Sequence, residues 1–188
     1  EKFENVILNA KISSGDINVD TVKEINIDND YGDVFIKKVE TAKINASAGD
    51  IKIDEVNNIN ADNNYGDIKI KNVYNYINLN CDCGDIKINN ATLNKNSVIK
   101  DDYGDITISN IKNVYIDSKT DYGDNDINNN DRKSDVVLKI KNNCGDIKVN
   151  WFDFYIFFEY NIVRLKKGWY YERKLNKFKK SINWKPKK

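Results

Sequence analysis

The sequence predicts an all-β protein, a single-stranded right-handed β-helix (β-solenoid) of about eight coils of 17–22 residues each. Three observations predict this fold class: a Gly-Asp pair recurs at regular intervals, apolar and polar residues alternate around it, and each position keeps its residue type between repeats. The recurring glycines are spaced 17, 17, 17, 18, 20, 19 and 22 residues apart, and they are Gly15, Gly32, Gly49, Gly66, Gly84, Gly104, Gly123 and Gly145.

The alternation around each glycine predicts strands that turn one face toward a core. The second residue after the glycine is Ile or Val in seven of the eight repeats, and the fourth is Ile or Val in all eight. Alternation with β-branched residues is typical of strands, so the intervening Lys, Asn and Asp residues are expected to face water. The seventh repeat departs from the pattern, because Asn125 and Asn130 stand at inward positions.

Two architectures are compatible with strands that repeat at this interval, a β-solenoid and an antiparallel meander of hairpins. A meander should show paired turn signals such as Asn-Gly, whereas this chain has one Gly-containing corner per repeat. Matching columns favour a stack of coils, each with three short strands and each rising by about 4.8 Å. The right hand is the one expected for parallel crossover connections.

The repeat pattern ends near residue 150, which predicts a repeat domain over residues 1–150 and a C-terminal cap with a basic tail over 151–188. Every even position from Phe152 to Ile162 is apolar, so we expect one long strand over 151–165. A turn at 166–168 would join it to a second strand "WYYERKL". This aromatic β-hairpin would cap the open edge of the last coil.

The tail after the hairpin differs in charge from the rest of the chain. The net charge is +1, yet residues 161–188 hold eleven Lys or Arg residues against one acidic residue. Leu175, Phe178 and Ile182 are spaced for one face of a short basic helix. Such a tail would suit peripheral contact with an anionic membrane or wall polymer, and the alternative is a solvated tail. Nucleic acid is not expected as a partner, because the acidic repeat domain would repel phosphate.

The corner aspartates have a structural and a metal-binding interpretation. A short Asp side chain can accept hydrogen bonds from N–H groups of its own turn, which is the interpretation we favour. The alternative is calcium, because three repeats add a second acid just before the corner, and Ca²⁺ takes six to eight oxygen ligands. These weak calcium candidates are Asp82, Asp85, Asp102, Asp105, Asp121 and Asp124. No other cofactor is expected, since the chain has no histidine and its three cysteines lack CxxC spacing.

Tyrosine is frequent at the residue before the corner glycine, which raises the alternative of an aromatic ligand-binding strip. Tyr103 and Tyr122 are weak candidates for glycan contact, since we expect them on adjacent coils. The competing interpretation is packing at the corner, with the ring half exposed. Cys83 and Cys144 are expected three coils apart, well beyond disulfide reach.

The "SGDI", "YGDI" and "CGDI" corners followed by Ile-x-Ile resemble a bacterial adhesin-like family of β-strand-repeat proteins over about residues 5–150. That family has a poorly defined function, is similar to the head domain of autotransporter adhesins, and often follows a membrane anchor in envelope proteins. The resemblance implies an extracytoplasmic, non-enzymatic role and supplies no catalytic residues.

We therefore expect a non-enzymatic adhesin-like scaffold or binding module of the cell surface or envelope, with a protein or a glycan as partner. It would be anchored through a membrane segment outside these residues, since the chain starts at Glu1 without an initiator Met. One alternative is a sensor or regulatory ectodomain of an envelope stress response, which would bind its partner through the loop 124–134 or the tail. A second is a polysaccharide-active β-helix enzyme, which three arginines and a thin rod disfavour.

Overall fold

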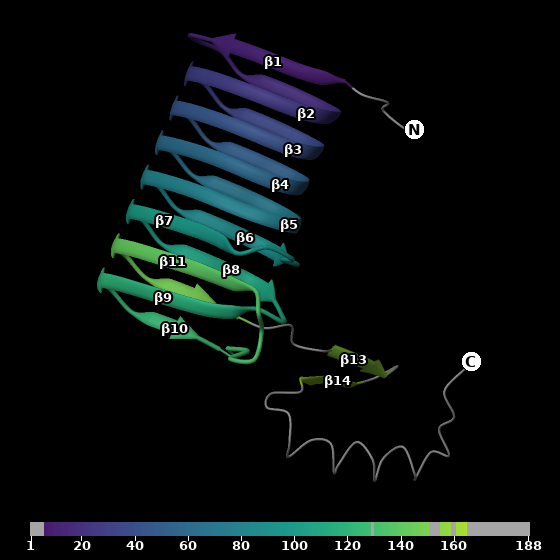
Figure 1. Cartoon of the computed structure of the whole chain (residues 1–188), viewed down its shortest axis with the longest axis vertical. Helices are drawn as coiled ribbons and strands as arrows, with labels where there is room; N and C mark the ends of the chain where they lie inside the picture. Colours follow the sequence, from purple (N-terminus) through teal and green to yellow (C-terminus); the bar gives the residue numbers. More distant parts are fainter. Residues whose placement is uncertain (1–5, 129, 151–154, 159–160, 165–188) are drawn as a thin grey trace. The chain divides into compact units, whose positions relative to one another are not determined.

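The computed structural model describes residues 6–128, 130–150, 155–158 and 161–164. Its described residues form strands and contain no helix. The chain divides into two compact units, Glu1–Trp151 and Phe152–Lys188, and each is described by itself. The first unit is a parallel β-solenoid, which confirms the predicted fold class (Figure 1).

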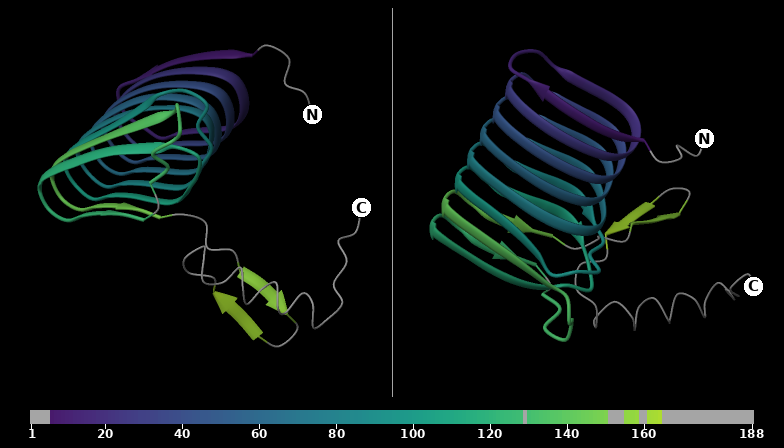
Figure 2. Two further views of the ribbon diagram at one scale, coloured as in Figure 1. Left: turned by 60° about the horizontal axis from the view of Figure 1, so that its bottom comes forward. Right: turned by 45° about the horizontal axis from the view of Figure 1, so that its top comes forward.

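The strands of the solenoid follow the repeats. They are β1 (Ile7–Ile12), β2 (Ile17–Tyr31), β3 (Val34–Ala48), β4 (Ile51–Tyr65), β5 (Ile68–Cys83), β6 (Ile86–Ala91), β7 (Ser97–Tyr103), β8 (Ile106–Ile111), β9 (Tyr115–Tyr122), β10 (Asn125–Ile127), β11 (Val137–Cys144) and β12 (Ile147–Val149). Equivalent residues of neighbouring coils pair in parallel register, for example Val34 with Ile51. Seen nearly end-on, each coil is a flattened loop (Figure 2).

The first complete coils contain one long strand each, and the prediction of three short strands is wrong for them. β2, β3 and β4 each run for 15 residues and β5 for 16 residues, from one Gly-Asp corner to the next. Each strand bends where two adjacent residues face outward, as Lys37 and Lys38 do between the buried Ile36 and Val39. The bend changes which residues point inward, while parallel pairing with the neighbouring coils continues on both sides of it.

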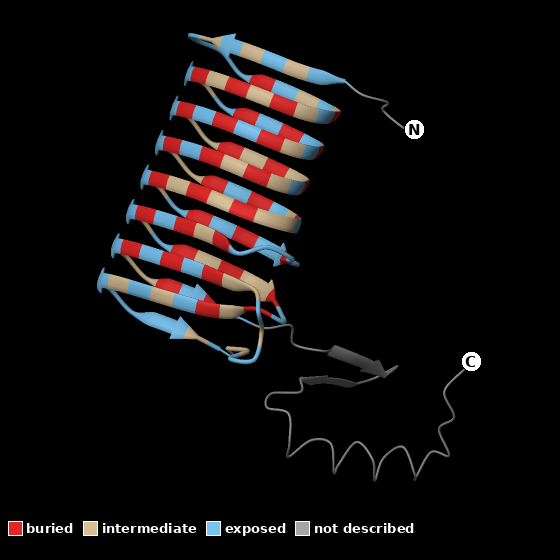
Figure 3. Cartoon of the chain, in the orientation of Figure 1, coloured by how far each residue is buried: buried red, intermediate tan, exposed pale blue. Residues whose placement is uncertain are grey.

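The core consists of columns of Ile and Val that stack along the solenoid. The residues at the second, fourth and seventh positions after the glycine are almost all buried, as Ile51, Ile53 and Val56 illustrate. Figure 3 shows buried residues alternating with exposed or intermediate ones along the strands of the inner coils. The main stabilising contribution in such a stack is the burial of apolar surface, which contributes about 25 cal/mol for each Å².

The last coils are not stacked in sequence order, contrary to our expectation. β11 pairs with both β7 and β9, and β12 pairs with both β8 and β10. The eighth repeat therefore lies between the sixth and the seventh (Figure 1). In spatial order the corner glycines are Gly15, Gly32, Gly49, Gly66, Gly84, Gly104, Gly145 and Gly123.

This order explains why the seventh repeat has polar residues at inward positions. Its strands β9 and β10 form the end of the solenoid, where only one side faces another coil. Asn125 exchanges hydrogen bonds with Ser118 at 3.1 and 3.2 Å, and Asn130 bonds to the backbone N–H and C=O of Ile116 at 2.7 and 2.6 Å. Both side chains therefore find hydrogen-bond partners within the seventh repeat itself.

The second unit contains β13 (Tyr155–Phe158) and β14 (Asn161–Arg164), which pair antiparallel. The prediction of one long strand over 151–165 is therefore wrong. Phe158 pairs with Asn161, and the apolar alternation of the sequence continues at the same period through both strands, so the sequence pattern cannot distinguish one long strand from two. The predicted second strand and the basic helix lie outside the described residues, and the capping role stays a prediction.

Candidate functional site

The corner aspartates form a hydrogen-bonded ladder along the whole solenoid. The backbone N–H of Asp33 donates to Oδ1 of Asp16 at 2.9 Å, and the same bond recurs between every pair of neighbouring coils at 2.8–3.0 Å. We expected each carboxylate to accept from its own turn, and that prediction was wrong. The donor is the amide of the next coil, because the parallel register stacks one corner directly on another.

Lysines two residues after some of these aspartates neutralise part of the ladder. Nζ of Lys52 lies 3.1 Å from Oδ2 of Asp50 and 3.5 Å from Oδ2 of Asp33, and Lys69 and Lys148 contact their own corner carboxylates at 2.7 and 2.8 Å. Lys69 and the amide of Asp85 hold the pKa of Asp67 below its usual range. The carboxylate of Asp67 therefore stays ionised through the neutral pH range.

The six calcium candidates lie on the corner edge near the β9 end of the solenoid, but they do not form one continuous cluster. Asn143 lies between Asp102 and Asp121 in the stack, and it donates to Oδ1 of Asp102 at 2.8 Å. Asp146 likewise separates Asp105 from Asp124. Among the residues that the structure describes, no three acidic, cysteine or histidine side chains gather closely enough to hold a metal ion.

The residues that precede the corner glycines alternate between tyrosine and a small side chain. Cys144 pairs with Tyr103 on one side and with Tyr122 on the other, so the expectation that Tyr103 and Tyr122 lie on adjacent coils is wrong. Tyrosines and small residues do not alternate regularly along the sequence, but the insertion of the eighth repeat makes them alternate regularly in space. We call this column the tyrosine edge, and in spatial order it consists of Ser14, Tyr31, Ala48, Tyr65, Cys83, Tyr103, Cys144 and Tyr122.

The rings of the tyrosine edge are accessible. Tyr31, Tyr65, Tyr103 and Tyr122 are 66%, 64%, 63% and 76% exposed. Consecutive tyrosines are two coils apart, which corresponds to about 9.6 Å at the spacing of parallel strands. Smaller side chains stand between the rings at the same interval, and we use the word hollow for these three positions, Ala48, Cys83 and Cys144. The edge can therefore contact a ligand that has a matching repeat.

The three cysteines are free thiols in different environments. Cys83 and Cys144 flank Tyr103 and are two coils apart, where sequence order predicted three. Both are partly exposed. Cys81 is buried, and its burial raises the pKa of the thiol to about 12, so this group is neutral and unreactive in the fold.

An interior column of polar residues runs beneath the corners, and the sequence analysis missed it. Asn29 donates to the carbonyl of Gly32 at 2.7 Å, Asn63 to that of Gly66 at 2.8 Å, and Thr120 to that of Gly145 at 3.0 Å. These residues stand three positions before a corner glycine, as do Cys81, Asp101 and Asn142. Only alignment on the glycine would have revealed them, because each looks like a surface residue.

Asp101 is the exception in this column. It is 2% exposed, and neither carboxylate oxygen has a hydrogen-bond partner among the described residues. Burial raises the pKa of Asp101 to about 7, the nearby amides of Tyr103 and Asp102 oppose the rise, and the carboxylate of Asp85 adds to it. A buried ionisable group of this kind is either a structural acid or part of a functional site.

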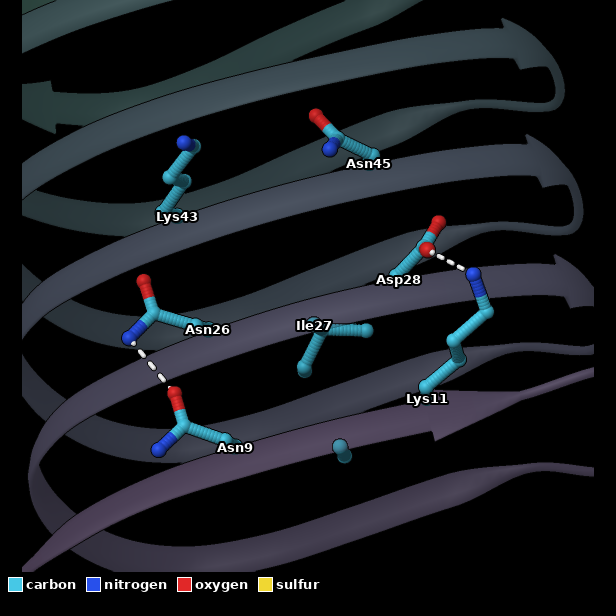
Figure 4. Close-up of a pocket in the computed structure, with 8 residues that line it drawn as sticks. Asn9, Lys11, Asn26, Ile27, Asp28, Lys43 and Asn45 are labelled. Carbon is cyan, nitrogen blue, oxygen red and sulfur yellow. Dashed lines mark hydrogen bonds and ion pairs between the residues drawn. The ribbon is translucent and has the colours of Figure 1, made fainter.

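A surface pocket lies on a flat face of the first three coils (Figure 4). Its volume is about 400 Å³, and polar side chains of β1, β2 and β3 line it. Lys11 pairs with Asp28 at 3.0 Å, and Asn26 donates to Asn9 at 3.0 Å. Since these groups already form an ion pair and a hydrogen bond with one another, they are less available for contact with a ligand than the rings of the tyrosine edge.

These features define a parallel β-solenoid whose coils are joined by Gly-Asp corners. Residues 4–150 match the family model described as Toastrack DUF4097, and the chain belongs to this family. The comparisons with curated proteins and with solved structures give no match. The predicted resemblance is thereby confirmed as far as a domain of unknown function, while its adhesin-like part stays a prediction.

The described residues contain no helix long and apolar enough to cross a membrane.

Proposed function

We propose that this protein is a non-enzymatic binding scaffold of the cell surface or envelope that presents the tyrosine edge to a partner. The observation that carries the proposal is the regular alternation of exposed tyrosines with small residues. Exposed aromatic rings forgo the free energy of burial, which contact with a partner would recover, and tyrosine contributes both apolar area and a hydroxyl. Four such rings in one line form a recognition surface.

The solenoid supports this role by holding the rings at fixed positions. The aspartate ladder joins every pair of neighbouring corners directly beside the tyrosines. Beneath the corners, Asn29, Asn63 and Asn142 are buried and donate to glycine carbonyls from inside. A preorganised surface of this kind loses little conformational entropy when it binds a ligand.

The placement outside the cytoplasm rests on the resemblance to adhesin-like envelope proteins. An anchor in a segment outside these residues would leave the solenoid facing the exterior. The alternative of a sensor ectodomain has less support at 124–134, because Asn125–Ile127 is strand β10 and Ser134 donates to the carbonyl of Asn113 at 2.7 Å. An enzyme would need an acid and a base that converge on a groove, whereas the acid and base in the pocket of Figure 4 pair with each other.

The test compares binding of the whole chain and its variants to isolated bacterial cell envelopes by sedimentation. Replacement of Tyr31, Tyr65, Tyr103 and Tyr122 by Ala should reduce binding by at least about tenfold, or about 1.4 kcal/mol. The matched control is Tyr74→Ala together with Phe35→Ala, which removes exposed aromatic rings elsewhere on the solenoid and should leave binding unchanged. Equal binding by the four-tyrosine variant and the wild-type chain would overturn the proposal.

A further inference from the structure

We infer that the tyrosine edge binds a proline-rich, basic segment of a partner protein in the polyproline II conformation. This inference rests on the proposed function, since it names the ligand class of the same surface. Three features of the edge support it: the spacing of the rings, the hollows between them and the charge on both sides.

The spacing of the tyrosines matches the repeat of a polyproline II helix. That helix has three residues per turn and a rise of about 3.1 Å per residue, so equivalent side chains recur every 9.3 Å or so. Consecutive tyrosines of the edge are separated by two coils, or about 9.6 Å. Over the three intervals from Tyr31 to Tyr122 the mismatch accumulates to only about 1 Å. An extended β-strand repeats on one face every 6.6–6.8 Å or so and loses register within one interval.

The hollows between the tyrosines suit proline rings. Ala48 lies between Tyr31 and Tyr65, Cys83 between Tyr65 and Tyr103, and Cys144 between Tyr103 and Tyr122. A proline at every third position would place successive rings in successive hollows, with a tyrosine ring on each side. Proline-rich segments are recognised in this manner by aromatic-lined grooves. The tyrosine hydroxyls can donate to the backbone carbonyls of the segment, which are free in this conformation.

The charge beside the edge selects a basic segment. Corner aspartates follow the glycines along one side, and four further aspartates precede the tyrosines or cysteines on the other side: Asp30, Asp82, Asp102 and Asp121. Toward the β9 end, Asp82, Asp85, Asp102, Asp105 and Asp124 have no ion pair within the described part of the chain. Lysine or arginine in the segment would pair with these carboxylates and stack on the tyrosine rings.

The distribution of lysines determines where along the edge the basic residues of the segment lie. Lys52 and Lys69 neutralise the ladder near Ala48 and Tyr65, whereas the carboxylates beside Cys83 and Tyr103 lack such partners among the described residues. Lys148 and Lys119 likewise pair with Asp146 and Asp121 at the β9 end. The basic part of the segment therefore lies beside Cys83 and Tyr103, between these two neutralised stretches. Acidic glycans and nucleic acids are repelled by the same carboxylates.

The experiment measures binding of the whole chain to synthetic peptides by isothermal titration calorimetry at low and high salt. The probe is (Pro-Pro-Lys)4, and the matched peptides are (Gly-Ser-Lys)4, which keeps the charge without the conformation, and (Pro-Pro-Glu)4, which reverses the charge. We expect the first peptide to bind at least tenfold more tightly than either of the others. Its affinity should fall as salt rises, since exposed charge pairs are screened.

Two variants test the geometry of the edge. Tyr65→Ala with Tyr103→Ala should weaken binding of (Pro-Pro-Lys)4 by about tenfold or more. Ala48→Tyr adds an aromatic ring but fills a hollow, so it should also weaken binding, which a merely aromatic surface would not show. The control Tyr74→Ala should bind as the wild-type chain does, and circular dichroism verifies that each variant is folded.

The outcomes separate this inference from the proposed function. Equal affinity for the three peptides, or unchanged binding by Ala48→Tyr, would overturn the inference. Tyrosine-dependent binding of neutral oligosaccharides in place of the peptide would also overturn it, while leaving the proposed binding scaffold standing. If the peptide binds through the tyrosines but envelope binding does not depend on them, the inference stands and the proposed function fails.

Discussion

Asp101 is an acid in a row of hydrogen-bond donors. Its neighbours in the column, Cys81 and Asn142, have a group that can donate to a corner carbonyl, and Asn142 does so at 2.8 Å. A carboxylate has no hydrogen to donate, whereas a protonated carboxyl group has one. Protonation would therefore complete the column, and it agrees in direction with a pKa that burial raises to about 7.

The stability of the fold should therefore depend on pH through Asp101, and Asp101→Asn should remove this contribution. The pKa is about 7 in the fold and near 3.9 in the unfolded chain, so the contribution of the protonated group is fully present below pH 4 or so. This contribution to the free energy of unfolding decreases progressively up to about pH 7, by up to about 4 kcal/mol in total. Asn offers a permanent donor, as Asn29 and Asn63 do in the same column.

Urea denaturation of the wild-type chain and of Asp101→Asn at several pH values between 4 and 8 measures this effect. The difference in unfolding free energy should grow with pH in favour of the variant. Other acids titrate equally in both proteins and cancel in the difference. A difference that stays constant across this range would show that Asp101 is ionised in the fold.

The thiols provide a second residue-scale prediction. At pH 8 a thiol reagent should modify Cys83 and Cys144 readily, because both are partly exposed on the tyrosine edge. Cys81 should react only after unfolding, since burial raises its pKa to about 12 and keeps it neutral. Mass spectrometry of the labelled peptides identifies the modified residues. Rapid modification of Cys81 in the folded chain would contradict the buried column.

At the scale of the corner, glycine is required because the coils stack closely. Gly66 has a φ of 128°, and a Cβ added to it would lie 2.3 Å from the carbonyl oxygen of Gly49. Gly15 has a similar φ of 121°, yet a Cβ there would meet nothing within 4 Å, because no described corner lies beyond it. A substitution at either position therefore strains the backbone, but only a substitution at Gly66 also clashes with a neighbouring corner.

Gly66→Ala should destabilise the fold more than Gly15→Ala. Both variants bear the cost of a left-handed conformation, of order 1 kcal/mol. The clash at Gly66 should add about 1–3 kcal/mol, which is typical of overpacking, since backbone atoms must move. Urea denaturation of the two variants gives the difference directly. Equal losses would mean that the conformation alone selects glycine at the corners.

The aspartate ladder predicts that calcium has little effect on stability. One oxygen of each corner carboxylate, except that of the terminal Asp124, accepts the amide of the next coil, and Asp50, Asp67 and Asp146 also contact lysines. We expect the same melting temperature in EDTA and in millimolar Ca²⁺. An increase of several degrees in calcium would show that the six acids near β9 bind the ion, and Asp102→Asn with Asp105→Asn should then remove the increase.

Much of the solenoid could be predicted from the sequence, because each column consists of residues of one type at a fixed distance from the corner glycines. The buried positions of Ile51 and Ile53 follow directly from that spacing. The interior donors were missed, since Asn63 in the core and an exposed Asn look alike in sequence unless they are aligned on the corner glycine. The regular tyrosine edge was also hidden, because it depends on where the eighth repeat inserts.

At the scale of the whole solenoid, the order of the coils follows from their interior residues. Coils with Ile or Val columns stack equally well on one another, so their pairing alone does not determine an order. The seventh repeat is different, because Asn125 and Asn130 would be costly between two apolar coils. At the end of the solenoid they bond to Ser118 and Ile116 instead, and the eighth repeat fills the interior position.

A disulfide test distinguishes this order from a sequential one. In the inserted order Tyr103 and Cys144 are paired neighbours about 5 Å apart, within the Cα range of a disulfide, whereas sequential stacking would separate them by two coils. Oxidation of Tyr103→Cys in a Cys83→Ala background should therefore link Cys144 to the new cysteine, as detected by mass spectrometry under non-reducing conditions. Tyr65→Cys in the same background is the control, since two coils lie between its corner and that of Cys144, and it should stay unlinked. Failure of the first variant to link, although both thiols react with a reagent, would show that the repeats stack in sequence order and that the tyrosines do not alternate.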